Sequence, residues 1–276
     1  MAEVSAAAVK ALRERTGLPM MDCKKALQEV GGDPEAAVDW LRKHGKKTME
    51  KRASRETSFG RVAVYADLEA RVGAMIELRC ESAPVTNNEE FVGLANDLVR
   101  QLATGPGATT PEELLAQPSP SRHGTPLGDQ MDELVNRIRE VFRLQRIVRI
   151  DGPCGGYAHH NGALGVLLHV EGGSAELAKD VCMHIAFSRP AVVAREQLDP
   201  SLVDKERAIQ MEAARQEGKP EKVLGKIVEG RMKDFYAKHC LLEQPFVKDA
   251  SQTVGKLVQA AGMKIVGFVL WDLGKE

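Results

Sequence analysis

The sequence predicts an α+β protein built from several parts, and three observations predict this class. The first 45 residues carry three short helical patterns in a row, each with its own start and stop signals. Two later stretches repeat the same order of strand hairpin and helix. A pair of charged helical patterns, broken at Gly218, follows them, and the chain ends in an alternating strand pattern.

The three N-terminal helices are short and separately delimited. The first begins after Ser5, a favourable N-cap, and ends at Gly17. The second starts at Pro19, a first-turn position, and its apolar stripe consists of Met20, Cys23, Leu27 and Val30. The third is capped by Asp33 and runs to Gly45. Because helices this short bury little apolar surface, we expect a docking module on a larger body.

A first β unit follows a polar stretch at residues 46–58. The segments RVAVYAD and RVGAMIELRC alternate in polarity and predict a hairpin with its turn near residues 67–71. An amphipathic helix is expected at residues 87–103, with inward-facing Phe91, Leu94, Ala95, Leu98 and Leu102. Three segments complete the unit: a proline-rich surface connection at 104–130 with one helical turn at 111–116, a helix at 131–144 and a strand at 146–151.

A near-copy of this unit comes next. Tyr65 and residues 71–76 match Tyr157 and residues 163–168 at a constant separation along the chain. The following helices match at a shorter separation, because the first copy carries the additional loop ESAPVTNNE after its second strand. An insertion in one copy of a duplication suggests a task that the fold itself does not require. Plain variation in loop length is the alternative.

Two charged helices at residues 199–238 are separated by the turn Gly218-Lys219-Pro220. The expected contact seam is thin and consists of Leu202, Ile209 and Ala213 against Val223, Ile227 and Phe235. A stripe this narrow predicts an antiparallel coiled-coil hairpin that protrudes into solvent. A helix at 251–262 and a strand at 264–274 end the chain.

Composition restricts the class of protein. A chain of 276 residues with 43% apolar content can bury a core and is expected to form two or three domains. A net charge of −1 gives no reason to expect nucleic acid as a partner. The start of the chain lacks a leader pattern, and no apolar run is long enough for a membrane span. We therefore expect a cytoplasmic protein.

The residue pattern predicts a protein without an active site. The five cysteines are widely spaced and lack a C-x-x-C pair, so neither a disulfide framework nor a zinc site is expected. No phosphate-binding G-x-x-x-x-G-K-[ST] loop is present. His159 and His160 have no ligand partners at suitable spacing, and Cys182 and His184 diverge on their helix. We expect no enzymatic activity, no cofactor and no bound metal.

Several segments together resemble one known family. TGLPMMDCKKAL and GDPEAAVDWLRKHG resemble the start of bacterial elongation factor Ts. The segments at 183–190, 218–236 and 241–249, and the final strand, resemble later parts of the same family in the same order. The resemblance thus covers nearly the whole chain.

The resemblance implies a modular architecture: a three-helix domain like the ubiquitin-associated domain, a duplicated α+β core with antiparallel sheets, and a protruding coiled coil. The implied boundaries are 1–47 for the three-helix domain, 48–60 for a linker, 61–150 and 151–198 for the two core repeats, 199–238 for the coiled coil and 239–276 for a segment that returns to the core.

The implied function is nucleotide exchange on a partner GTPase, elongation factor Tu. The factor would bind the GDP-bound partner and promote GDP release, with magnesium displacement, so that GTP can bind. Neither nucleic acid nor membrane is implied as a partner, and self-association is left open. Two other classes remain: an adaptor that captures a peptide or ubiquitin-like surface, and a thiol enzyme that uses Cys182 or Cys80.

The resemblance also implies contact residues for the partner. In the three-helix domain these are Arg13, Met20, Met21 and Lys24. Because adjacent helix positions point about 100° apart, we expect one methionine to be buried and the other to be an exposed, adaptable contact.

In the second repeat and the C-terminal segment the implied contacts are Leu164, Gly165, His184, Phe246, Val247 and Lys248. The first repeat carries Gln101 where the second carries His184, so the fold does not need histidine there. This favours a contact role for His184, with a hydrogen-bonded packing role as the alternative.

The additional loop is where this chain departs from the family. The family typically has T-D-F-V after the strand, and its Asp-Phe pair acts near the magnesium site of the GTPase. This chain has Ser82-Ala83-Pro84-Val85 instead. The position of the loop implies the same task, and Pro84 offers a rigid apolar knob without the aromatic ring or the acid.

Overall fold

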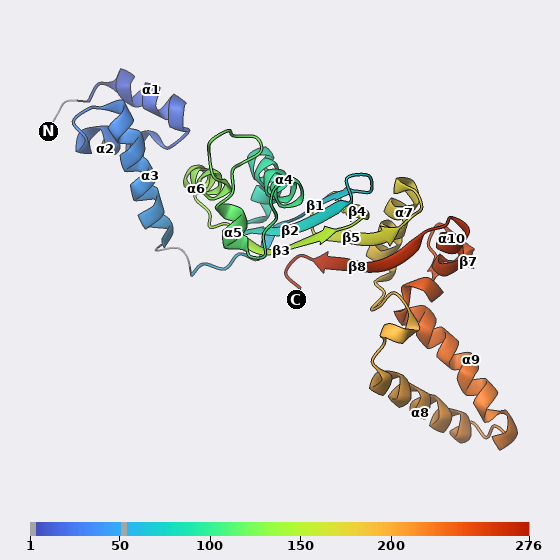
Figure 1. Cartoon of the computed structure of the whole chain (residues 1–276). Helices are drawn as coiled ribbons and strands as arrows, with labels where there is room; N and C mark the ends of the chain where they lie inside the picture. The colour runs from blue at the N-terminus through green and yellow to red at the C-terminus, as the bar shows by residue number, and fades with distance from the viewer. Residues whose placement is uncertain (1–3, 51–53, 276) are drawn as a thin grey trace.

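The structure, a computed structural model, describes residues 4–50 and 54–275. Figure 1 shows three helices at the N-terminal end, two antiparallel sheets with their helices in the middle, and a long helical hairpin that extends from the opposite end. The predicted α+β class with antiparallel sheets is confirmed.

The N-terminal module consists of α1 (Ala6–Thr16), α2 (Met20–Glu29) and α3 (Pro34–Glu50). Ser5 caps α1 by accepting a hydrogen bond from the backbone N–H of Ala8, and Gly17 ends the helix in the left-handed conformation. Its small core contains Val9, Leu12, Cys23, Ala26, Leu27, Ala37 and Leu41. The three predicted helices are confirmed.

The predicted end of the third helix at Gly45 is wrong, since α3 continues to Glu50. One glycine inside a helix costs only about 1 kcal/mol, so Gly45 by itself does not end the helix. The start of the expected linker at 48–60 is therefore helical, its residues 51–53 lie outside the described part of the chain, and the first strand begins at Phe59.

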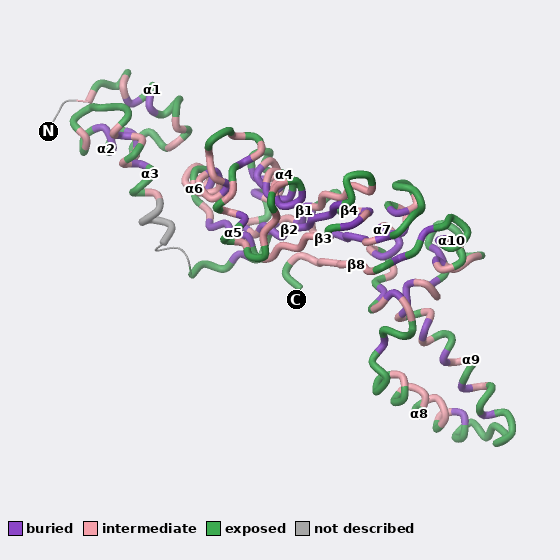
Figure 2. The backbone as a smooth tube through the Cα atoms, in the orientation of Figure 1, coloured by how far each residue is buried: buried purple, intermediate pink, exposed green. Residues whose placement is uncertain are grey.

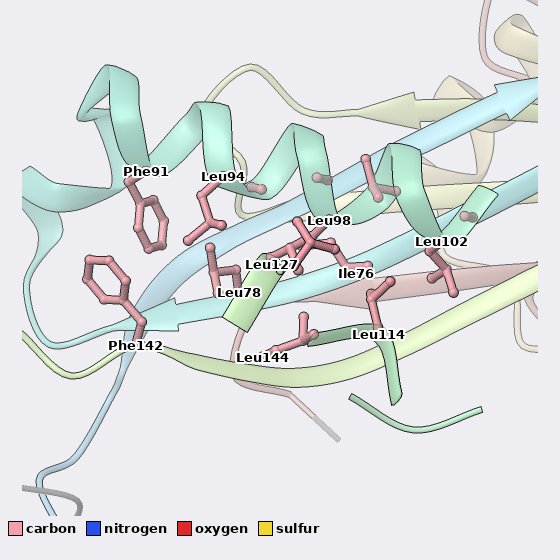
Figure 3. Close-up of a cluster of buried hydrophobic side chains, with 14 of the residues drawn as sticks. Ile76, Leu78, Phe91, Leu94, Leu98, Leu102, Leu114, Leu127, Phe142 and Leu144 are labelled. Carbon is pink, nitrogen blue, oxygen red and sulfur yellow. The ribbon is translucent and has the colours of Figure 1, made fainter. Parts of the chain in front are cut away.

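The first repeat folds as a three-stranded sheet in the order β1 (Phe59–Asp67), β2 (Val72–Cys80) and β3 (Arg143–Asp151). Between β2 and β3 the chain forms η1 (Ala83–Asn87), α4 (Glu89–Thr104), α5 (Pro111–Leu115) and α6 (Leu127–Ile138). The hairpin turn and the inward face of α4 are as predicted. Figure 3 shows the core, in which the edge of the Phe91 ring meets Phe142 and the leucines of α4 cover the sheet.

The predicted helix at 131–144 is shifted. In the structure α6 spans Leu127–Ile138, and its C-cap Arg139 adopts a left-handed conformation with φ of 66°. Val141 and Phe142 are then buried in an extended segment that leads into β3. A residue in the left-handed conformation does not continue a right-handed helix. Beyond it, the alternate residues Phe142 and Leu144 lie on one face of the extended chain and pack in the first core.

The second repeat has the same plan. Its sheet has the order β4 (Cys154–Ala158), β5 (Leu164–Glu171) and β8 (Lys264–Asp272), and α7 (Ala175–Ser188) packs on it. The buried positions correspond between the helices: Leu98, Val99 and Leu102 of α4 match Val181, Cys182 and Ile185 of α7. Each repeat is thus a hairpin, a helix and a third antiparallel strand.

The two sheets pack face to face through Val62, Met75, Cys154 and Leu167. The approach is so close that a Cβ atom on Gly165 would lie 2.4 Å from Cγ1 of Val62. Glycine at position 165 is therefore a packing requirement of the sheet interface.

The helical hairpin consists of α8 (Pro200–Gln216) and α9 (Glu221–His239). Figure 2 shows that much of both helices is exposed and that the buried positions of the hairpin lie mainly on α9. The predicted seam is displaced by one residue. The hairpin buries Ala214, Leu224, Val228, Met232 and Tyr236, with Val203 and Met211 packed beside them. Of the predicted residues, Phe235 packs on this cluster, and Ala213 and Ile227 are half-buried. Leu202, Ile209 and Val223 are exposed. A shift of one residue turns a helical side chain by about 100°, which moves the predicted stripe off the contact face.

The chain returns to the core through short elements. These are η2 (Arg195–Gln197) before the hairpin, and η3 (Leu241–Glu243), β6 (Pro245–Phe246), β7 (Asp249–Thr253) and α10 (Val254–Ala260) after it. The predicted helix at 251–262 is shorter than expected, since Ser251 and Gln252 belong to β7 and Thr253 caps α10 by accepting from the N–H of Lys256.

Candidate partner-binding surfaces

The N-terminal module presents an apolar and basic surface on α2. Met20 is 49% exposed and Met21 is 70% exposed, and the exposed Lys24 lies one turn after Met20. Arg13 is exposed near the end of α1. The expectation that one methionine is buried is wrong, because smaller side chains fill the module's core. The side chain of methionine is unbranched and flexible, so two exposed methionines form an adaptable apolar surface.

The additional loop of the first repeat follows β2. Residues 81–88 connect β2 to α4, whereas only residues 172–174 connect β5 to α7. Ala83 and Pro84 are exposed, while Val85 is buried against the first core. Asn88 then caps α4 by accepting from the N–H groups of Glu90 and Phe91. The loop is thus anchored by Val85 and presents Ala83 and Pro84 to solvent.

His184 is fully buried on α7, which departs from the expectation of a surface contact. Its Nε2 atom lies 2.9 Å from Oε1 of Gln244, and its Nδ1 atom accepts from the N–H of Val247 at 3.2 Å. This arrangement needs the neutral imidazole with the proton on Nε2. Burial lowers the pKa of His184, and the hydrogen bond to Gln244 opposes this. The geometry fits the alternative role, a hydrogen-bonded packing residue.

The equivalent position in the first repeat makes a similar bond. Nε2 of Gln101 donates to Oε1 of Gln117 at 3.0 Å, as His184 donates to Gln244. Each repeat therefore uses a polar residue of its helix to hold the segment that follows.

The segment held by His184 carries three of the predicted contact residues. Phe246 is buried, and its ring centroid lies 5.8 Å from that of His184. Val247 is 44% exposed, and Nζ of the exposed Lys248 lies 2.6 Å from Oδ1 of Asp180. Val247 and Lys248 are on the surface, whereas Phe246 and His184 support them from beneath.

The predicted contact at the start of β5 is largely internal. Leu164 is half-buried, and Gly165 lies between the two sheets. Gly165 therefore offers no surface in this conformation. A nearby residue that the sequence analysis missed is Phe187, which is 76% exposed near the end of α7. Phe187 lies off the buried stripe of α7, and this position in the sequence pattern could have indicated an exposed aromatic side chain.

The cysteines have the properties of packing residues. All five are buried, and burial raises the pKa of Cys80 to about 12. Burial also raises the pKa of Cys182, to a still higher value. A reactive thiol needs an accessible thiolate, so the burial of these side chains disfavours the hypothesis of a thiol enzyme.

Within residues 4–50 and 54–275, no cluster of three His, Cys, Asp or Glu side chains has a metal-binding arrangement. No helix in the same residues has the length and apolar character of a membrane span.

Comparison with known proteins adds the family. The sequence model of the family described as Elongation factor TS matches residues 81–275. The chain belongs to the elongation factor Ts family. The elongation factor Ts of Thioalkalivibrio sulfidiphilus is 39% identical over 99% of this chain and 92% of its own length. That of Saccharopolyspora erythraea is 41% identical over the full length of both chains. The family places the chain among the factors of translation elongation.

Proposed function

We propose that this protein promotes the release of GDP from the GTPase elongation factor Tu, so that GTP can bind. The observation that carries the proposal is that the likeness to elongation factors Ts extends over the whole chain, from the exposed methionines to the last strand. The buried thiols and the exposed, mixed surfaces fit a protein that acts by binding rather than by covalent chemistry.

The physical basis of exchange is linkage. The factor and GDP each weaken the binding of the other to the GTPase by the same free energy. Release that is faster by about four decades requires a barrier lower by about 5.5 kcal/mol, at about 1.36 kcal/mol per tenfold. Displacement of a magnesium ion and distortion of a phosphate-binding loop on the partner can supply a change of this size. The factor needs only to fit the nucleotide-free partner better than the GDP-bound one.

Each exposed surface has a proposed task. Met20, Met21, Lys24 and Arg13 grip the partner beside its guanine-binding end. The loop from Ser82 to Val85 acts at its magnesium side. Leu164, Val247 and Lys248 form a third contact, which Phe187 extends, while Gly165, His184 and Phe246 support this surface from within the core. A partner in translation implies that the protein works in the cytoplasm.

The test is the release of fluorescent GDP from the cognate elongation factor Tu with and without this protein. The proposal expects a large acceleration that saturates with factor concentration. A chain lacking residues 1–50 is the informative variant, because the module has its own core and the two sheets remain complete without it. We expect it to lose most of the acceleration. Unchanged release in the presence of the intact chain would contradict the proposal.

A further inference from the structure

The segment after α6 ties together three parts of the molecule that are far apart in sequence. Arg137 pairs with Glu90 at the start of α4, and Arg139 pairs with Asp22 of the N-terminal module. The next residue, Glu140, accepts two hydrogen bonds from Ser82. The consecutive residues Arg139 and Glu140 thus contact the N-terminal module and the loop at Ser82, which both carry surfaces assigned above to the partner.

The contact between Glu140 and Ser82 is one half of a reciprocal clamp. Oε2 of Glu140 accepts from the N–H of Ser82 at 3.0 Å, and Oε1 accepts from its hydroxyl. In return, Oε1 of Glu81 accepts from the N–H of Val141 at 2.7 Å. We call these four residues, Glu81, Ser82, Glu140 and Val141, the carboxylate clamp. Hydrogen bonds to a carboxylate are the stronger kind, so the clamp holds both chain segments firmly.

The clamp lies where the ladder between two strands ends. The last paired residues of β2 and β3 are Arg79 and Arg143. Beyond them the side chains of Glu81 and Glu140 replace backbone acceptors, which leaves the backbone free to turn out of the sheet. The sulfhydryl of Cys80 also donates to the carbonyl of Ser82 at 3.4 Å. Ser82 is therefore fixed through its N–H, its hydroxyl and its carbonyl.

A fixed Ser82 determines the direction of the residues after it. Ala83 and Pro84 begin the short helix η1 and are exposed, and Val85 anchors its far side in the core. Pro84 has a fixed φ, so little freedom is left between the clamp and the anchor. The exposed pair is held in one orientation before any partner binds, which lowers the entropic cost of using it.

We infer that Glu140 is a positioning residue for the loop from Ser82 to Val85. It acts through Ser82 to present Ala83 and Pro84 in the orientation that acts on the partner. This inference rests on the proposed function and adds a residue outside every surface assigned to the partner. Glu140 therefore affects the rate at which the bound partner releases GDP. The affinity for the partner, to which the N-terminal module and the surface at Val247 contribute, is unchanged.

The experiment compares four full-length variants: Glu140→Ala, Glu140→Gln, Ser82→Ala and Glu133→Ala. Glutamine at 140 can still accept from the N–H of Ser82 and donate to its hydroxyl, so it retains the clamp. Glu133 lies on α6, before this segment, and pairs with Arg122, so Glu133→Ala removes the same charge away from the loop. It is the matched control.

For Glu140→Ala we expect the maximal GDP release rate to fall about tenfold, a change of about 1.4 kcal/mol in the barrier. The half-saturating concentration should stay within about twofold. Glu140→Gln and Glu133→Ala should match the unaltered protein, and Ser82→Ala should be intermediate. Adding Pro84→Gly to Glu140→Ala should slow release no further, because both changes act on one loop. A Glu140→Ala protein with the normal maximal rate, a slow Glu140→Gln protein, or additive effects would overturn the inference.

Hydrogen exchange of the free protein separates this inference from the proposed function. The amides of Ser82 and of residues 85–88 should exchange faster in Glu140→Ala but not in Glu140→Gln or Glu133→Ala. Equal protection in all variants would overturn the clamp whatever the exchange activity. An unaltered protein that does not accelerate GDP release would instead contradict the proposed function. If Glu140→Ala does not fold, Ser82→Ala decides, and unchanged loop protection in that variant overturns the inference.

Discussion

At the scale of single residues, His184 connects the packing of the second repeat to its surface. The side chain is buried on α7 and holds the N–H of Val247, which is on the surface. Its partner Gln244 also donates to the carbonyl of Lys238 at the end of α9. One imidazole therefore joins α7, the end of the hairpin and the segment 245–248.

His184 makes the stability of the protein depend on pH. Burial lowers the pKa of His184 from its ordinary value of 6.5. The unfolded chain then binds the proton more readily than the folded one, so stability is complete above about pH 6.5 and falls as the pH drops below it. We expect urea unfolding at pH 7.5 and pH 5.5 to show this loss, and His184→Gln to reduce it. Glutamine is the matched replacement because Gln101 holds the same place in the first repeat. An equal loss in both proteins would mean that other groups cause it.

Single residues were also where the sequence was least informative. Burial of Cys23 and Leu27 followed from helical spacing, and the N-cap Ser5 followed from its position before the first helical pattern. The direction of Met20 did not, because a module this small leaves part of any apolar stripe exposed. Nor did the carboxylate clamp, whose partners are separated by 58 and 60 positions along the chain and have no periodic signal.

At the scale of elements, the loop after β2 is a short rigid helix with one buried anchor. Its exposed residues are uncharged, so they carry no charge that would need to be desolvated at the partner. Proline is smaller than phenylalanine, so under the proposed function we expect the loop to depend on its orientation rather than on the depth to which it inserts.

We predict that Pro84→Gly slows GDP release in the presence of magnesium and has a smaller effect when magnesium is chelated. Glycine removes both the apolar ring and the fixed φ. Pro84→Ala is the matched control, since it retains a Cβ atom and a narrower backbone range, and it should be affected less. Equal slowing with and without magnesium, or no slowing, would show that this loop does not act on the metal.

The tip of the helical hairpin lies away from the two sheets of the core (Figure 1). Its base cluster joins Leu198, Met232, Tyr236 and Cys240, and the guanidinium of Arg195 lies 4.2 Å from the ring centre of Tyr236. The remaining length of the hairpin has only a single buried seam.

We predict that replacing residues 212–227, which lie outside the base cluster, with a short glycine-rich turn leaves the thermal unfolding of the core unchanged within a few degrees and leaves GDP release intact. Tyr236→Ala, which opens the base cluster, should instead destabilise the protein by about 3 kcal/mol. Thermal melts and release assays of both variants decide this. A shortened chain with a strongly lowered melting temperature would show that the tip packs on the core.

Element boundaries were predictable where a cap or a turn residue marks them. The hairpin turn follows from Asp67, whose carboxylate accepts from the N–H groups of Glu69 and Ala70. The end of α6 was not predictable, because Arg139 adopts its left-handed conformation without a glycine. The prediction of the hairpin seam was wrong for a related reason. Two apolar stripes one residue apart are equally periodic, and only tertiary contacts decide which of them is buried.

At the scale of the whole molecule, the N-terminal module rests on α6 through ion pairs. Arg42 of α3 pairs with Asp129 of α6, and Asp22 of α2 pairs with Arg139. A cavity of about 240 Å³ remains between α3 and α6, so apolar packing is incomplete there. Exposed ion pairs contribute only about 0 to 1 kcal/mol each and are screened by salt.

We predict that the module detaches from α6 as ionic strength rises. We expect dyes attached at the exposed positions Lys10 and Lys179 to show a longer mean distance and a broader distance distribution as salt rises from about 0.05 to 1 M. At about 1 M the screening length is only about 3 Å. Arg42→Asp should cause the same change at low salt, and Asp129→Arg in the same chain should reverse it. A distance that does not respond to salt or to charge reversal would show a rigid attachment.

The arrangement of the second sheet also determines when the protein can finish folding. Its third strand, β8, is made from nearly the last residues of the chain, yet it pairs with the central strand β5. During synthesis the first sheet has all three strands long before β8 has emerged from the ribosome. Until then β5 has an open edge, the kind of surface that pairs with other chains. Completion of the second sheet also requires contacts that are distant in sequence, which form slowly. A factor of translation elongation thus carries an open sheet edge during its own synthesis, until β8 is available to pair with β5.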